Sequence, residues 1–153
     1  MNRAQVLGKR ATGVPEIDFE HGLQIGLIEA FQSAIAGGGG GEEPRRILER
    51  LMDFTNAHFL AEQLMMRLYN YPDYEGHVQE HDRLVDALKV IQDGLASGAP
   101  ADGSGAVGRL HEWWVTHVQT QDQAFAAFLK ERAPAGEGVP SSGAGPKTFP
   151  GVE

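Results

Sequence analysis

Apolar residues recur every three or four positions in four stretches of this 153-residue chain, and glycine and proline separate the stretches. This spacing places the apolar side chains on one face of a helix, as in amphipathic helices that pack together. The clearest break is the run of five glycines at positions 37–41, each of which costs a helix about 1 kcal/mol relative to alanine. The pattern predicts an all-α fold, an up-down-up-down antiparallel four-helix bundle.

Proline and glycine also indicate where the helices begin and end. Pro72 disfavours helical backbone at Tyr71, which ends the second helix, and Gly98 and Pro100 follow the third. The predicted helices cover about residues 17–35, 42–70, 73–95 and 104–132.

The two ends of the chain differ in composition from the helices. Residues 1 to about 15 are expected to form an extended N-terminal arm that ends at Pro15. Residues 133–153 are rich in Pro, Gly and Ser and poor in apolar residues, so we expect a flexible tail. The predicted globular domain is therefore 1–132.

Charge and cysteine content exclude several classes of function. The net charge of −8 argues against nucleic acid and anionic membrane surfaces as partners. The absence of cysteine excludes disulfides, iron–sulfur clusters and thiolate zinc sites. The N-terminus shows no signal peptide, and no apolar run approaches the roughly 20 residues of a membrane span. We expect a soluble, cytoplasmic protein, most simply a monomer.

Most of the histidines lie on the apolar faces of the predicted helices. A single histidine there is more often a hydrogen-bonded core residue than a metal ligand. Five histidines and an acid converging from four helices are different, because burying them costs several kcal/mol unless their polar atoms are satisfied. A metal centre satisfies them together. The candidate ligands are His21, His58, Glu62, His77, His81 and His117, whereas His111 is expected to face solvent.

Asp122 is the seventh candidate. It follows His117 by five residues, which is about 140° around an ideal helix. Asp122 would have to reach sideways to bridge two ions, or a local π-bulge would have to close the angle.

The number and type of ligands favour two metal ions. If two octahedral ions share the site, five imidazoles, two bridging carboxylates and one bridging oxo or hydroxo group fill all but one coordination position. The open position suits a small ligand such as O₂. Seven ligands exceed the four of a structural zinc site, and the chain has no Glu-x-x-His motif of the ferritin-like oxidases.

These stretches resemble the hemerythrin family, in particular its single-domain bacterial members. The matching segments are GVPEIDFEH, HFLAEQLMM, YPDYEGHVQEH and WWVTHVQTQD. The resemblance implies a non-haem di-iron centre that binds O₂ reversibly. One iron would be held by His77, His81 and His117, and the other by His21 and His58 with the open position. Glu62 and Asp122 would bridge the two irons.

The resemblance also implies which residues line the ligand pocket: Phe59, Trp113, Trp114 and Val118. The family usually has leucine at the position of Trp114, and an indole there would narrow the pocket if it points inward. If it turns toward a neighbouring helix, it belongs to the core alone. A second departure is Gln63, where the family often has an acid.

Two functions follow as expectations. The first is reversible binding of O₂, for storage, delivery or sensing, by a protein that is not an enzyme. Azide and nitric oxide are further expected ligands. The alternative is a di-iron redox enzyme that acts on peroxide or nitric oxide. Five neutral imidazoles and two carboxylates supply less negative charge to high-valent iron than a carboxylate-rich site does, which favours reversible binding.

Overall fold

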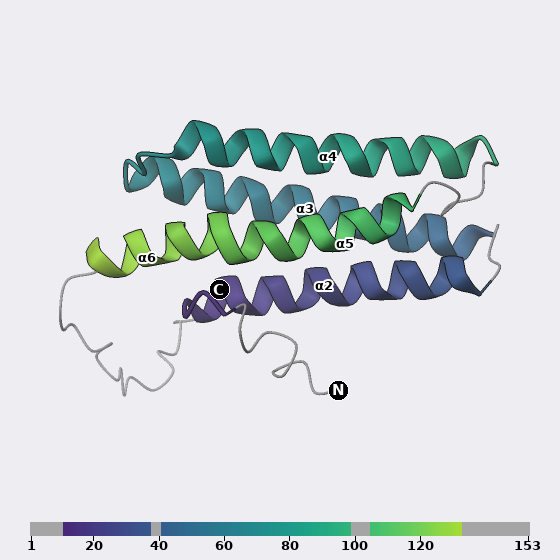
Figure 1. Ribbon diagram of the computed structural model, residues 1–153, viewed down its shortest axis with the longest axis horizontal. Coiled ribbons are helices and arrows are strands. Elements are labelled where there is room, and N and C mark those ends of the chain that lie inside the picture. The colour runs from purple at the N-terminus through teal and green to yellow at the C-terminus, as the bar shows by residue number, and fades with distance from the viewer. Residues whose placement is uncertain (1–10, 38–40, 99–104, 133–153) are drawn as a thin grey trace, which may run out of the picture.

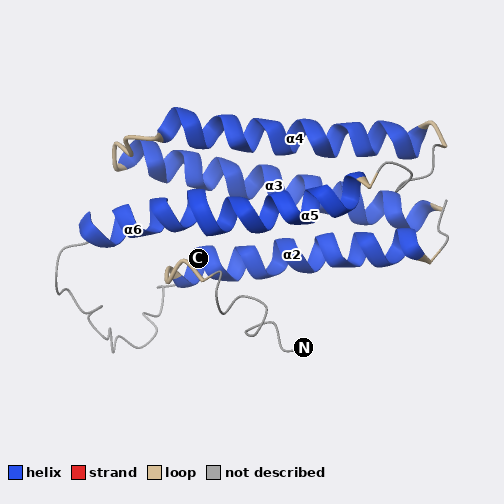
Figure 2. Ribbon diagram, viewed as in Figure 1, coloured by secondary structure: helices blue, strands red, loops and turns tan. Residues whose placement is uncertain are grey.

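The computed structural model describes residues 11–37, 41–98 and 105–132, and most of these residues lie in helices (Figures 1 and 2). No strand occurs within these three ranges. The elements are α2 (Pro15–Ala36), α3 (Glu42–Leu68), α4 (Tyr74–Ala96), α5 (Ala106–His117), the π-helical segment η1 (Val118–Asp122) and α6 (Gln123–Arg132). The last three follow one another without interruption and together form the fourth rod of the molecule.

The helices form a closed ring of neighbours. α2 packs on α3, α3 on α4, α4 on α5, and α5 on α2. The chain reverses direction at each connection, so that consecutive helices are antiparallel (Figure 1). The predicted all-α, up-down-up-down four-helix bundle is confirmed.

Local backbone geometry explains two helix ends. α3 ends at Leu68, slightly before the predicted boundary, because Asn70 adopts a left-handed conformation with φ of 52°. The Tyr71 amide then donates to the Met66 carbonyl at 2.8 Å, which satisfies one of the last carbonyls of the helix. After α4, Gly98 has φ of 75°, a conformation that glycine adopts without a steric penalty.

The apolar faces meet along the axis of the bundle. The side chains that are almost fully buried there come from all four rods and include Ile28, Phe31, Leu48, Leu51, Leu88, Leu110 and Phe125. Each such side chain stabilises the fold by roughly 1.5–3 kcal/mol relative to its exposed state. Not every apolar residue of the second predicted helix belongs to this core, because Leu60 and Leu68 are exposed on α3.

The described part of the N-terminal arm is fastened to the bundle by hydrogen bonds. The amides of Thr12 and Gly13 donate to the Asp18 carboxylate at 2.7 and 3.1 Å, and the Thr12 hydroxyl donates to it at 2.8 Å. Lys130 of α6 donates to the Thr12 carbonyl at 2.5 Å. The rest of the predicted arm (1–10) and the predicted tail (133–153) lie outside the described residues.

None of the described helices combines the length and the apolar character that crossing a bilayer needs.

Candidate metal centre

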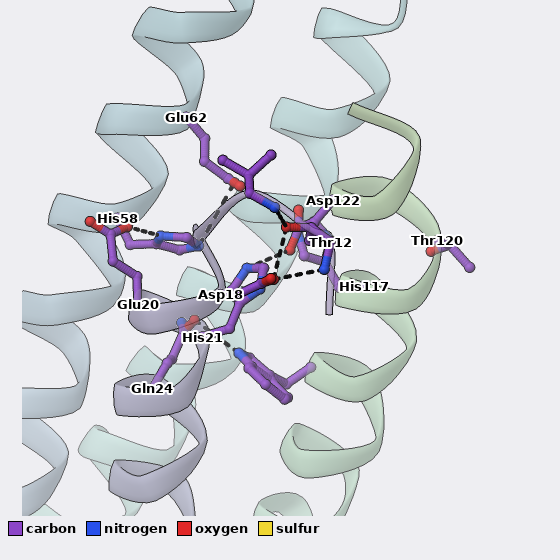
Figure 3. Close-up of polar contacts among 12 residues, drawn as sticks. Thr12, Asp18, Glu20, His21, Gln24, His58, Glu62, His117, Thr120 and Asp122 are labelled. Atoms are coloured by element: carbon purple, nitrogen blue, oxygen red, sulfur yellow. Dashed lines mark hydrogen bonds and ion pairs between the residues drawn. The ribbon is translucent and has the colours of Figure 1, made fainter. Parts of the chain in front are cut away.

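The seven predicted ligands meet in the interior of the bundle. Their side chains come from every rod: His21 from α2, His58 and Glu62 from α3, His77 and His81 from α4, His117 from α5 and Asp122 from η1. All seven are at most 4% exposed. Figure 3 shows several of these side chains pointing toward one another between the helices. The structure therefore brings together every residue that the sequence pattern singled out.

Asp122 is the most densely surrounded of the seven. Its Oδ1 lies 3.0 Å from Nε2 of both His77 and His117, and its Oδ2 lies 2.9 Å from Nε2 of His21. A single carboxylate thus faces imidazoles from three rods.

The second carboxylate, Glu62, faces the histidines of α3 and α4. Its Oε2 lies 3.3 Å from Nε2 of His81, 3.7 Å from Nε2 of His77 and 3.9 Å from Nε2 of His58. Two ligand groups result, in each of which the ligand atoms lie within 4.8 Å of one another, and both contain Glu62 and Asp122. The first adds His77, His81 and His117, and the second adds His21 and His58.

The hydrogen-bonding state of these atoms tests whether a metal fits. Despite the short distances, none of the polar atoms of the two carboxylates, and none of the Nε2 atoms of four of the histidines, forms a hydrogen bond. These histidines are His21, His77, His81 and His117. Buried polar atoms without partners are rare and costly. Cations at the centre of the cluster satisfy all of them, so the donor set fits metal ions.

Burial and neighbouring charges set the protonation of the metal-free cluster. Burial, together with His117 and His77, lowers the pKa of His81 to about 2, which leaves a neutral imidazole with a free lone pair. Burial also raises the pKa of Glu62, and the charge of Asp122 adds to the increase. For Asp122, burial opposes ionisation, but His117, His21 and His77 outweigh it and hold its pKa well below the usual value.

The segment η1 explains how His117 and Asp122 reach the same centre. Its backbone follows a π-helical path over Val118–Asp122, where bonds from residue i to i+5 replace the α-helical pattern. The wider turn brings residues five apart onto one face, and Nε2 of His117 and Oδ1 of Asp122 lie 3.0 Å apart. Of the two possibilities raised by the sequence, the structure has the π-bulge.

Aromatic rings cover the imidazoles. Phe59 stacks on His81 with ring centroids 3.6 Å apart, and Trp113 stacks on His117 at 4.6 Å. Trp114 meets the third imidazole, that of His21, edge to face at 5.8 Å and 89°. These aromatic residues and the buried Val118 are the four predicted pocket residues. The indole of Trp114 is buried, lies against His21 and also reaches Gln24 of the neighbouring helix α2, so both interpretations of its direction stay predictions.

Comparison with known proteins identifies the family. The family model of the hemerythrin HHE cation binding domain matches residues 12–129, which is most of the chain and includes all seven candidate ligands. The chain belongs to the hemerythrin family.

Individual hemerythrin relatives are distant in sequence. A bacteriohemerythrin of Methylococcus capsulatus is 25% identical over 118 residues, covering 77% of this chain and 89% of the relative. A bacteriohemerythrin of Ralstonia nicotianae is 29% identical over 87 residues, covering 57% of this chain but only 64%, just under two thirds, of the relative. A myohemerythrin of Sipunculus nudus is 28% identical over 82 residues, covering 54% of this chain and 62% of the relative.

Two residues of this hemerythrin chain contact the outer nitrogens of the cluster. Glu20 Oε2 lies 2.6 Å from Nδ1 of His58, and Gln63 Nε2 lies 3.5 Å from Nδ1 of His81. A carboxylate at Nδ1 accepts the ring proton and leaves the Nε2 lone pair of His58 for a metal. Gln63 does the same for His81 only with its amide oxygen turned toward Nδ1, because an NH₂ donor there would place the ring proton on Nε2. In the sequence, Gln63 stands out only as a departure from the family, and no spacing pattern distinguishes Glu20 from other surface acids.

The protonation of His21 predicts a pH dependence of metal binding by this hemerythrin. Burial alone would lower the pKa of His21, but contact with Asp122 and the charge of Glu62 raise it above 6.5. A metal ion must displace this proton, so affinity should fall as the pH drops through that raised pKa, by at most about tenfold per pH unit for each proton displaced. Competition with a chelator over a pH series that extends upward from 6.5 measures this slope, and an affinity independent of pH would contradict it.

Proposed function

We propose that the chain binds O₂ reversibly at a non-haem di-iron centre in the interior of the bundle. The observation that carries this proposal is the pair of overlapping ligand groups, which share two buried carboxylates whose oxygens have no hydrogen-bond partner. Membership of the hemerythrin family supports it, because that family implies iron binding without haem and oxygen binding.

The proposed ligands divide between two irons as the two groups do. His77, His81 and His117 would hold one iron, and His21 and His58 the other. Glu62 and Asp122 would bridge, as carboxylates common to both groups. The iron with two histidines has fewer protein ligands and would keep the open position.

The chain's own residues then decide what reaches that position. Reduced iron supplies the electrons with which O₂ is bound. Phe59, Trp113, Trp114 and Val118 surround the histidines with apolar surface, which favours a small neutral ligand over water and anions. The low pKa of His81 keeps this imidazole unprotonated and available to iron over the whole physiological range.

One experiment tests the function directly. Purified protein should contain two irons per chain, be colourless when reduced and gain a visible absorption band with O₂ that disappears when O₂ is removed. A single zinc ion in place of iron would contradict the proposal. Rapid consumption of O₂, peroxide or nitric oxide over many turnovers, without a stable adduct, would instead support the redox enzyme.

A further inference from the structure

A buried chain of two hydrogen bonds lies one helical turn from the metal ligands. Gln24 follows His21 by three residues, and Thr55 precedes His58 by three. On the fourth rod, Trp114 precedes His117 by three residues. The indole Nε1 of Trp114 donates to Gln24 Oε1 at 2.9 Å, and Gln24 Nε2 donates to the Thr55 hydroxyl at 2.9 Å.

The direction of this chain is fixed by chemistry. An indole nitrogen only donates, so it must meet the oxygen of the Gln24 amide. The amide nitrogen must then face Thr55, whose hydroxyl oxygen accepts. All three residues are at most 1% exposed, so water does not replace a broken bond. The network therefore favours one orientation of the indole.

That orientation places Trp114 beside the ligand group that contains only two histidines. Its ring stands at 89° to the imidazole of His21, with centroids 5.8 Å apart. His21 belongs to the group with two histidines, which in the proposed function holds the iron with the open position. In Figure 3, Gln24 lies beside His21 on α2, close to the labelled ligands of the cluster.

We propose that Gln24 and Thr55 are positioning residues that hold Trp114 against His21 and thereby make the open position selective for ligands as small as O₂. This inference rests on the proposed function. The physical basis is that rotating the indole away breaks a buried hydrogen bond. The Trp114 N–H donor and the Gln24 oxygen acceptor would then both be buried without a partner. A leucine at the same place has no polar atom and cannot be held in this way.

Gln24→Met tests the proposal, since methionine has a similar length but its thioether sulfur is only a weak hydrogen-bond acceptor and cannot donate to Thr55. Azide should bind to the oxidised, iron-loaded variant about tenfold faster than to the wild type. Loss of one hydrogen bond allows the population of indoles turned away from His21 to rise by about this factor. Gln32→Met is the matched control: it makes the same substitution on α2, at a half-buried position more than two turns away. Its azide rate should equal that of the wild type.

Two variants of Thr55 separate positioning from packing. Thr55→Val keeps the shape and removes the acceptor, so azide binding should accelerate. Thr55→Ser keeps the hydroxyl and should retain the slow rate even if it lowers the thermal midpoint. Equal rates in the valine and serine variants would overturn the proposal.

A second readout does not depend on iron chemistry. The indole N–H band in the ultraviolet resonance Raman spectrum should shift in Gln24→Met and stay unchanged in Gln32→Met. If the wild type binds no iron or no azide, the proposed function fails. If it binds both, and Gln24→Met shifts the band but leaves the azide rate unchanged, the function stands and the positioning role is wrong.

Discussion

Replacing His77 with alanine should remove most of the iron from the purified protein. The imidazole of His77 lies 3.0 Å from Asp122 and 3.7 Å from Glu62, so it faces both proposed bridges. Changes in residues that merely orient a ligand lower metal affinity by about 10- to 100-fold, and loss of a ligand itself should cost at least as much. Elemental analysis of iron per chain measures the effect.

The matched control is His111→Ala. His111 is half-buried on α5 and lies outside both ligand groups, so its removal should leave the iron content unchanged. Equal iron in the His77 and His111 variants would mean that the assignment of ligands is wrong, whatever the protein binds.

Trp114→Leu should speed both azide binding and the autoxidation of the O₂ complex, and should lower the thermal midpoint. The smaller side chain leaves space beside His21 and leaves the Gln24 oxygen without its donor. Cavity formation and the lost bond together should cost roughly 2–4 kcal/mol. For a chain of this size, that corresponds to a decrease of roughly 5–15 °C.

Phe31→Leu separates access from stability. Phe31 is fully buried on α2, ten residues after His21, which is about 15 Å along the helix. This variant should lower the midpoint by a similar amount and leave the azide rate unchanged. If Trp114→Leu behaves in the same way, the indole is core packing and does not restrict the pocket.

Local patterns in the sequence were sufficient to predict the helices and the seven side chains that lie together in the interior. A candidate ligand can be recognised in the sequence when a histidine or an acid occupies a position that the helical periodicity assigns to an apolar residue. His58 and Glu62 on α3 are examples. The positions of the helices depend on the same periodicity, which explains why the predicted bounds differ little from those of the structure.

Residues whose partners come from another helix could not be predicted in this way. Gln24 resembles any polar residue of α2 until Trp114, 90 residues later, is placed against it. Glu20 becomes significant only because the packing of α2 on α3 brings it to His58. The direction of Trp114 stayed open for the same reason, since spacing within one helix does not identify the neighbouring rod.

The π-helical segment changes the rotational register of side chains about the axis of the fourth rod, so that α5 and α6 follow different registers. Before it, Val107, Leu110 and Trp114 face the axis of the bundle, and after it Phe125 does so again. On a regular α-helical path with the same number of residues, everything beyond this segment would be rotated by about 100° relative to the residues before it, and Asp122 would lie about 140° from His117. Asp122 and Phe125 would then turn away together. Along this stretch, the path of the backbone is therefore more tightly constrained than the identity of the exposed and half-buried residues between His117 and Asp122.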